Sequence, residues 1–300
     1  MNIIERAVQK LDQEPRDTAE PSDKRHQELN DDSVSETDRL ASLSALETPI
    51  DHAEEAESEP ISHKVRINLE KLSSAGFITL QTADSRIAEQ CRYIKRPLLS
   101  RAAKNDDRDK LIMVASALTG EGKTFMAINL AMSIAMEIDR NVCLVDADVL
   151  RPSICKLFNV KAEHGLTDLL AGAKLELSDV ILKTNVSSLD LLPSGEIHDQ
   201  ITELFASAKM GQVMTELSRR YDIVIFDSMP VLAESGVSVL ASLMGQIVFV
   251  VESVKTSRRV VQEALNVLGP HGGIGLVLNK SREHFGHKYG YHNYYGHARR

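Results

Sequence analysis

Short, fully apolar runs alternate with amphipathic stretches along most of the chain, and this alternation limits the possible folds more than any other feature. The apolar runs predict β-strands at residues 111–115, 142–145, 189–192, 223–226, 247–251 and 274–278. Apolar residues at helical spacing predict helices at residues 124–137, 206–220 and 257–268. Because the strands are apolar on both faces, they indicate a mostly parallel, doubly wound α/β sheet that helices cover on each side.

The region before these strands has a different composition. Residues 1–63 carry 17 acidic and 6 basic side chains, so they account for the acidity of a chain whose net charge is −8. Apolar spacing predicts a short docking helix at residues 1–11, which packs on its own domain, on a partner protein or on a membrane surface. Residues 12–63 are predicted to be a disordered acidic linker, because their few apolar side chains cannot offset the entropy of ordering them.

The folded region is predicted to span residues 64–280, and helical patterns at residues 65–72 and 85–95 open it. The three cysteines form no CxxC pair, which is typical of buried thiols in a reducing cytoplasm. The sequence shows neither a signal peptide nor an apolar run of about 20 residues, so we expect a soluble, cytoplasmic chain. Aromatic residues make up only 4% and Trp is absent, which weighs against a nucleic-acid-binding protein that stacks bases.

A glycine-containing loop, Ala-Leu-Thr-Gly-Glu-Gly-Lys-Thr at residues 117–124, joins the first predicted strand to the helix that follows it. In that setting the backbone amides of the loop and the N-terminus of the helix point at phosphate oxygens, which predicts a P-loop nucleotide site. Lys123 would reach the β- and γ-phosphates of ATP, and the Thr124 hydroxyl would bind Mg²⁺. The predicted ATP-binding residues are Thr119, Gly120, Glu121, Gly122, Lys123 and Thr124.

Acidic residues follow two of the predicted strands. Asp146 and Asp148 come after the strand at 142–145, and Asp227 comes after the strand at 223–226. Parallel strands end at one edge of the sheet, so these carboxylates should lie beside the phosphate loop and not act only as helix caps. We expect Mg²⁺ to be held by Thr124, Asp146 and Asp227. The catalytic residues would be Lys123, Asp146 and Asp148, with one carboxylate accepting a hydroxyl proton.

The last 20 residues, 281–300, contain four of the six tyrosines of the chain and several His and Gly residues, with no apolar period. This segment follows the strand at 274–278, so it is predicted to be a flexible tail that starts at the edge where the phosphate loop lies. We expect its tyrosines to accept phosphate; the alternatives are a solvated low-complexity tail and a His-based metal site. Tyr93 and Tyr221 are predicted to be packing residues. The candidate acceptors are Tyr289, Tyr291, Tyr294 and Tyr295.

Several motifs resemble, in the same order, those of the bacterial tyrosine autokinases of polysaccharide export. They are Leu144–Pro152, Gly165–Gly172, Leu192–Gly195, Arg220–Leu232 and Gly275–Lys280. The resemblance covers about residues 64–300 and implies a P-loop NTPase fold of the MinD/ParA-like superfamily. It also implies an ATP-dependent protein-tyrosine kinase that phosphorylates its own C-terminal tyrosines and regulates exopolysaccharide synthesis. The N-terminal sequence MNIIERAVQKLDQ further resembles an exosortase-associated subgroup.

The resemblance also implies partners. In the split arrangement of this family, a separate membrane protein that determines chain length activates a cytoplasmic kinase and holds it at the inner membrane. The family's ring-forming helix has the pattern Glu-x-x-Arg-x-x-Arg, and Glu89, Arg92 and Lys95 resemble it, although an ion pair within the helix is the simpler interpretation. Met229 stands where the family has the first of two prolines, and we expect this change to alter the stiffness of the loop.

Two other functions share the same fold. A switch ATPase of the MinD/ParA type hydrolyses ATP without phosphorylating protein, and a nucleotide-binding scaffold lacks activity. The switch ATPases carry a second Lys at the loop position where Leu118 stands here, and they have no use for a tail of tyrosines. Asn279 and Lys280, which follow the last strand, are placed to touch the nucleotide base.

Overall fold

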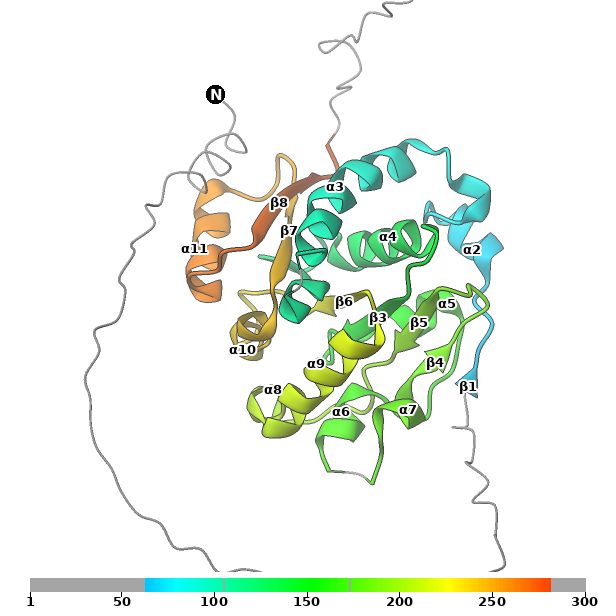
Figure 1. The fold of residues 1–300 in the computed structure, drawn as a ribbon. Helices are drawn as coiled ribbons and strands as arrows, with labels where there is room; N and C mark the ends of the chain where they lie inside the picture. The colour runs from blue at the N-terminus through cyan, green and yellow to red at the C-terminus, as the bar shows by residue number, and fades with distance from the viewer. Residues whose placement is uncertain (1–62, 105, 173, 282–300) are drawn as a thin grey trace, which may run out of the picture. The chain divides into compact units, whose positions relative to one another are not determined.

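The computed structural model describes residues 63–104, 106–172 and 174–281. Within these residues one sheet of eight strands has the order β1-β4-β5-β3-β6-β2-β7-β8 (Figure 1). The strands are β1 (His63–Lys64), β2 (Leu111–Ser116), β3 (Val142–Ala147), β4 (Leu182–Lys183), β5 (Leu189–Leu192), β6 (Ile223–Ser228), β7 (Gln246–Glu252) and β8 (Ile274–Asn279). Only β4 and β5 pair antiparallel among these strands, which confirms a mostly parallel α/β sheet.

Helices connect most of the strands. They are α2 (Leu69–Ser74), α3 (Arg86–Ala102), α4 (Lys123–Ala135), α5 (Ile154–Phe158), α6 (Leu166–Leu170), α7 (Leu177–Val180), α8 (Ile201–Ala206), α9 (Ala208–Arg220), α10 (Gly236–Leu243) and α11 (Arg258–Leu268). Two 3₁₀ turns are η1 (Leu80–Thr82) and η2 (Asp107–Lys110). Among the described residues, none of these helices combines the length and the apolar character that a membrane span requires.

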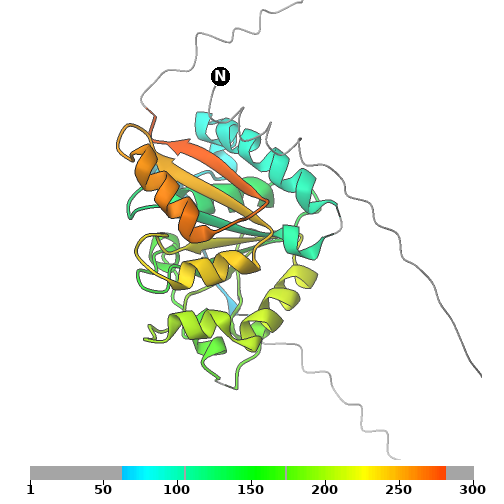
Figure 2. The same ribbon diagram turned by 90° about the vertical axis from the view of Figure 1, so that its left-hand side faces the viewer.

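The helices form a layer on each face of the sheet (Figure 2). Helices α2 to α5 pack on one face, and α6 to α11 pack on the other, so the sheet separates two hydrophobic cores. Side chains of β2 alternate between these cores, with Leu111 and Met113 on one side and Ile112 and Val114 on the other. This alternation is the reason that the sequence of β2 is apolar throughout.

Helix α4, which follows the glycine-containing loop, is buried along most of its length. Every residue from Met126 to Ala135 is buried, because α4 lies between α3 and the sheet. A helix that is apolar on nearly every face, as α4 is apart from Asn129 and Ser133, needs such a position. Its N-terminus follows β2 directly, so packing fixes the orientation of the loop that joins the two elements.

Two expectations about the start of the folded region are wrong. The stretch from Val65 to Asn68 is not helical, because the Val65 amide donates to the Lys183 carbonyl and α2 starts only after its Asn68 cap. Helix α3 does not end near residue 95 but continues past Pro97 to Ala102. Pro97 is exposed, and burial of Leu98 after it stabilises the continued helix.

Candidate functional site

The loop between β2 and α4 has the backbone of a phosphate cradle. Gly120 and Gly122 adopt left-handed φ values of 85° and 102°, which residues with a Cβ atom rarely adopt. A Cβ atom on Gly122 would lie 2.1 Å from Nδ2 of Asn279, so a larger residue would both strain the backbone and displace that side chain. Gly122 also caps α4 without a side-chain hydrogen bond, which leaves the first amides of the helix available to an anion.

Glu121 contributes its backbone to this cradle, while its carboxylate points elsewhere. The side chain is buried, and its Oε2 atom accepts a hydrogen bond of 2.6 Å from the Leu118 amide. The other carboxylate oxygen accepts hydrogen bonds from the Glu252 amide (3.3 Å) and from the Thr256 hydroxyl. Glu121 therefore closes the loop on itself and ties it to the end of β7, whereas Thr119 is exposed at the tip.

Asp146 and Asp227 lie next to each other near the carboxyl ends of two central strands of the sheet. They are register partners on β3 and β6, and Asp227 is also paired with Val114 on β2, the strand that leads into the loop. Oδ2 of Asp146 accepts hydrogen bonds from the Ser153 and Ile154 amides at 3.1 and 3.0 Å. Oδ1 of Asp146 and both carboxylate oxygens of Asp227 are buried and have no hydrogen-bond partner among the described residues.

The pKa values of both carboxyl groups are raised above those of an ordinary aspartate. Burial raises the pKa of Asp227 to about 7, and the Lys123 ammonium and the nearby Thr124 hydroxyl oppose this shift. Burial also raises the pKa of Asp146 to about 6, although the amides of Ile154 and Ser153 stabilise its charged form. Buried carboxylate oxygens without partners are costly. Oxygen donors of this kind are the ligands that Mg²⁺ prefers, so the residues present fit a divalent cation.

Asp148 is brought to the loop as well, where it pairs with Lys123. Its Oδ2 atom lies 2.8 Å from Nζ of Lys123, and both side chains are buried. Its Oδ1 atom accepts a hydrogen bond of 3.2 Å from the Arg151 amide. The described residues hold no group of three acidic, His or Cys side chains that would form a complete metal cage. Asp148 thus holds Lys123, and its negative charge also acts on the neighbouring Asp146 and Asp227 carboxyl groups, whose pKa values it helps to raise.

The loop after Asp227 is fixed to the strand that carries the phosphate loop. The amides of Val231 and Leu232 donate to the carbonyls of Ser116 and Ala117 at 2.9 and 3.2 Å. Met229, at the position of the missing proline, is fully buried in the core. These contacts hold the backbone in place around Asp227 without a proline ring.

The expected ring-forming set on α3 is not uniform. Glu89 and Arg92 are exposed, and Arg92 donates a hydrogen bond of 2.9 Å to the Ala83 carbonyl. Lys95 is buried: its ammonium donates to the Ser133 carbonyl at 2.7 Å and lies 2.8 Å from a Glu137 oxygen. The prediction that Lys95 serves ring contacts is therefore wrong, since its charge is used inside its own chain.

The predictions for the tyrosines have three different outcomes. Tyr221 is buried and its hydroxyl donates to Asp190 at 2.6 Å, so the prediction of a packing residue is confirmed. Tyr93 is 67% exposed, so the same prediction is wrong for it, because its position on α3 faces away from the core. The four C-terminal tyrosines and the proposed docking helix at residues 1–11 lie outside the described residues.

The last described residues show where the C-terminal segment begins. Strand β8 ends at Asn279, whose side-chain amide donates to the Glu121 carbonyl, and Lys280 donates to the Gly120 carbonyl. The chain therefore leaves the sheet beside the phosphate loop. From the sequence we expected Asn279 and Lys280 to touch a nucleotide base. Their hydrogen bonds to the loop could not be predicted, because no local pattern reports a contact between residues 160 positions apart.

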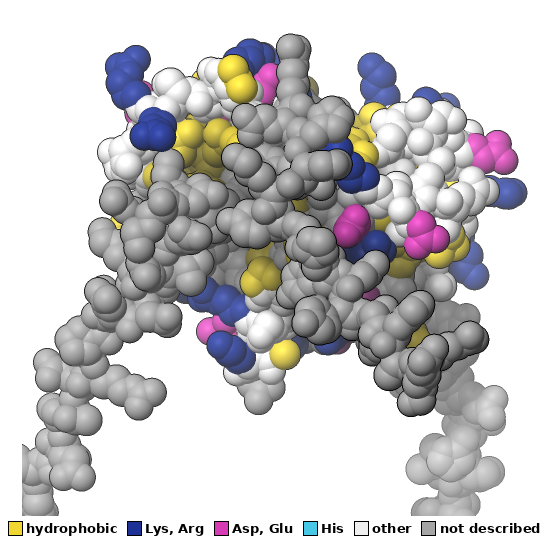
Figure 3. Space-filling model, turned by 90° about the horizontal axis from the view of Figure 1, so that it is seen from above, with side chains coloured by type: hydrophobic (Ala, Val, Ile, Leu, Met, Phe, Trp, Pro, Cys, Tyr) yellow, Lys and Arg dark blue, Asp and Glu magenta, His cyan; other side chains and the backbone are white. Residues whose placement is uncertain are grey.

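Figure 3 shows the molecule from above, with part of the described surface left open between residues drawn in grey. Lys and Arg side chains stand separately there, among acidic and neutral ones.

Comparisons with known proteins agree with this site. A family model described as an AAA domain matches residues 109–262. The tyrosine-protein kinase YwqD of Bacillus subtilis is 31% identical over 207 residues, which cover 68% of this chain and 86% of that protein. The putative tyrosine-protein kinase CapB of Staphylococcus aureus is 28% identical over 198 residues, which cover 65% of this chain and 85% of that protein.

A solved structure shows the same fold at comparable identity. The kinase domain of the Escherichia coli tyrosine kinase ETK matches with a TM-score of 0.60 and 30% identity, and the match covers 70% of this chain and 84% of that domain. The region that the family model matches, residues 109–262, includes the phosphate loop and all three aspartates described above. The chain therefore belongs to the bacterial tyrosine-protein kinases, enzymes that use ATP and are built on a P-loop α/β domain.

Proposed function

We propose that this kinase transfers the γ-phosphoryl group of MgATP to tyrosines in its own C-terminal segment. The observation that carries the proposal is the pair of buried carboxylates, Asp146 and Asp227, whose unpartnered oxygens lie beside an anion-binding loop. The acceptor candidates begin fewer than ten residues after Lys280, which contacts that loop. The proposed acceptors are Tyr289, Tyr291, Tyr294 and Tyr295.

The residues divide the work of binding. The amides of the loop from Thr119 to Gly122, together with the N-terminus of α4, would hold the phosphates of ATP. Thr124, Asp146 and Asp227 would hold the magnesium ion. When bound, the ion supplies positive charge that offsets the charge developing on the transferred group. The chain itself provides a fixed geometry, because β2, β3 and β6 are neighbours in the centre of the sheet.

Lys123 and Asp148 exchange partners in the proposed reaction. Lys123 leaves the Asp148 carboxylate and binds the phosphates, which frees Asp148 to accept a proton. The phenolic oxygen then attacks the γ-phosphorus, the bond from that phosphorus to the bridging oxygen breaks, and ADP leaves. The phenolic proton goes to Asp148. Asp146 is less suited to this role, because two backbone amides already hold one of its oxygens.

The cellular role follows from the resemblance of the motifs to kinases of polysaccharide export. The kinase would regulate exopolysaccharide synthesis, with a membrane protein of the chain-length-determining class as its activator and its link to the inner membrane. Glu89 and Arg92 remain exposed on α3 and are the residues we propose for assembly into a ring. Membership of the exosortase-associated subgroup is a prediction that rests on residues 1–13 alone.

Incubation with labelled ATP and Mg²⁺ tests the proposed activity. The full chain should incorporate label into protein, whereas Lys123→Ala should not, because it removes the ammonium that binds the phosphates. A variant with all four C-terminal tyrosines changed to Phe should bind ATP but remain unlabelled. Label in the Lys123→Ala protein would contradict the proposal. Hydrolysis of ATP without labelled protein would instead favour a switch ATPase.

A further inference from the structure

The end of β8 is bonded to the back of the phosphate loop. Nδ2 of Asn279 donates a hydrogen bond of 2.8 Å to the Glu121 carbonyl, and Nζ of Lys280 donates one of 2.6 Å to the Gly120 carbonyl. The same asparagine amide lies where a Cβ atom of residue 122 would be, so the loop and β8 are in close contact. Two consecutive carbonyl groups of the loop are therefore held toward β8.

The direction of these carbonyls fixes the direction of two amides. In a trans peptide the C=O and N–H groups point to opposite sides. The Gly120 carbonyl shares its peptide plane with the Glu121 amide, and the Glu121 carbonyl shares its plane with the Gly122 amide. When both carbonyls point at β8, both amides point to the opposite side, toward the phosphate cradle. Neither amide donates a hydrogen bond to another described residue, so both are available to a ligand.

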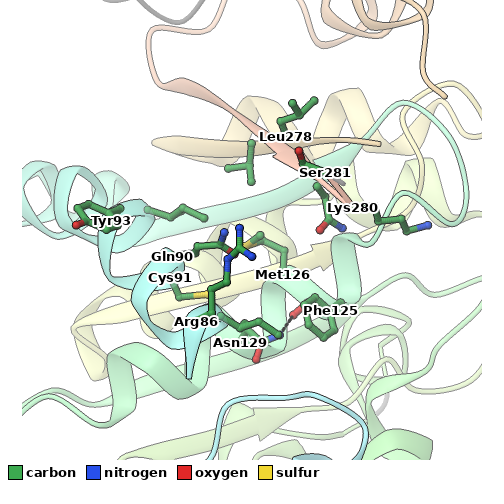
Figure 4. A pocket seen from close by; sticks show the side chains of 14 residues that line it. Arg86, Gln90, Cys91, Tyr93, Phe125, Met126, Asn129, Leu278, Lys280 and Ser281 are labelled. Atoms are coloured by element: carbon green, nitrogen blue, oxygen red, sulfur yellow. Dashed lines mark hydrogen bonds between the residues drawn. The ribbon is translucent and has the colours of Figure 1, made fainter. Parts of the chain in front are cut away.

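Lys280 is held in an unusual conformation that favours this contact. Its φ value is 55°, in the left-handed region that is unfavourable for a residue with a Cβ atom. Its ammonium also lies 3.2 Å from a Glu252 oxygen at the end of β7. Lys280 borders a cavity of about 490 Å³ between α3 and β8, but in Figure 4 its side chain runs away from the middle of that cavity. The side chain is thus directed at the loop.

We propose that Asn279 and Lys280 are positioning residues for nucleotide binding, which hold the loop so that the amides of Glu121 and Gly122 face the phosphates. They act through the loop backbone and not through the base. The inference rests on the binding of ATP to this loop, which is part of the proposed function. Because Lys280 directly precedes the C-terminal segment, the same contacts tie the start of that segment to the nucleotide site.

Lys280→Met tests this role, since it keeps an unbranched side chain and removes the donor. We expect the dissociation constant for ADP, measured by calorimetry on the full chain, to rise about tenfold. The KM for ATP should rise more than kcat falls, because oriented amides bind the ground state as well as the transition state. Lys280→Arg, which keeps a charged donor, should recover most of the lost affinity.

Lys255→Met is the matched control. Lys255 lies 3.3 Å from the same Glu252 carboxylate and is exposed, but among the described residues no hydrogen bond or ion pair joins it to the loop. This variant removes the same charge close to the same partner, so its affinity for ADP should remain within about twofold of the unchanged protein. An equal loss in the Lys255 and Lys280 variants would show an effect of charge alone and would overturn the proposal.

Two further outcomes separate this inference from the proposed function. If the unchanged protein fails to bind ADP, the proposed function itself is wrong. If the unchanged protein binds ADP and Lys280→Met binds it equally well, the positioning role is wrong while the proposed function stands. A lower thermal midpoint of Lys280→Met with unchanged ADP affinity would assign Lys280 a structural role only, and would likewise overturn the inference.

Discussion

The burial of the Asp227 carboxylate destabilises the folded protein when no ligand is bound. This side chain is completely buried at the centre of the sheet, neither of its oxygens has a hydrogen-bond partner among the described residues, and its pKa is raised to about 7. Asp146 next to it has one unpartnered oxygen and a pKa near 6. At the residue scale, the site is therefore arranged for the bound state at the expense of the unbound one.

Asp227→Asn should stabilise the unliganded protein at pH 8 while removing its response to Mg²⁺. The folded pKa of Asp227 is raised above its ordinary value of 3.8, so the ionised form opposes folding. Its stability cost is absent below about pH 4, grows as the pH rises toward 7, and is complete above it. We expect the substitution to add about 2 kcal/mol at pH 8, or about 4–8 °C in the thermal midpoint.

The control for this prediction is Asp199→Asn, which changes an exposed carboxylate. Its thermal midpoint in EDTA should be unchanged at both pH 8 and pH 5. The gain of Asp227→Asn should be smaller at pH 5 than at pH 8, because Asp227 is then already largely protonated. A thermal midpoint of Asp227→Asn that is equal to or below that of the unchanged protein at pH 8 would contradict the assignment.

Gly122→Ala should abolish nucleotide binding. The added Cβ atom would collide with Nδ2 of Asn279, and φ at this position is 102°. We expect no measurable ADP binding by calorimetry. Gly211→Ala in α9 has open space around its Cβ atom and should retain ADP binding, with a stability gain of up to about 1 kcal/mol from helix propensity. Tight ADP binding by the Gly122 variant would show that the loop moves away from β8.

At the scale of elements, one buried lysine joins two helices of the same layer. The ammonium of Lys95 on α3 binds the Ser133 carbonyl in the last turn of α4 and the Glu137 carboxylate just after it. A cation at the C-terminus of a helix is favourable, because it meets free carbonyl groups and the negative end of the helix dipole. This contact holds α3 against α4, and α4 in turn positions Lys123.

Lys95 and Arg92 should therefore differ in what they control. Lys95→Ala should lower the thermal midpoint by an amount equivalent to about 1–3 kcal/mol, because it leaves a buried carbonyl and a carboxylate without their partner. Arg92→Ala should change stability by less than about 0.5 kcal/mol, since Arg92 is exposed. If α3 forms the contact between subunits, Arg92→Ala alone should reduce the assembly size in light scattering without unfolding the chain.

The reverse pattern would contradict this division. A Lys95 variant of unchanged stability that fails to assemble would place Lys95 at the surface and not between the helices. An Arg92 variant that unfolds would show that Arg92 stabilises the fold of its own chain.

At the scale of the whole molecule, the phosphate loop, three carboxylates and the start of the C-terminal segment share one edge of the sheet. Each phosphotyrosine in that segment would add about −1.5 to −2 charges. Four such groups would repel one another across a ring of subunits. We predict that phosphorylation loosens the assembly, so the phosphorylated full chain should be smaller in light scattering than a variant with all four C-terminal tyrosines changed to Phe. Equal sizes under the same conditions would refute this.

The central sheet and the loop could be predicted from sequence because both depend on local patterns. Strand β2 is a continuous apolar run, and the loop after it has glycines at the two positions that need a left-handed backbone. The two-residue strands β1 and β4 carry no such pattern and form only through pairing with distant segments. The positions of Lys95 and of the Glu121 carboxylate depend on packing in the same way, so the resemblance that grouped Lys95 with the ring-forming residues did not reveal its burial.

Mapping of phosphorylated residues by mass spectrometry tests the central claim most directly. The full chain would be incubated with ATP and Mg²⁺, digested and searched for phosphotyrosine. The account predicts phosphate on one or more of Tyr289, Tyr291, Tyr294 and Tyr295. Complete consumption of ATP with none of these four tyrosines modified would contradict it.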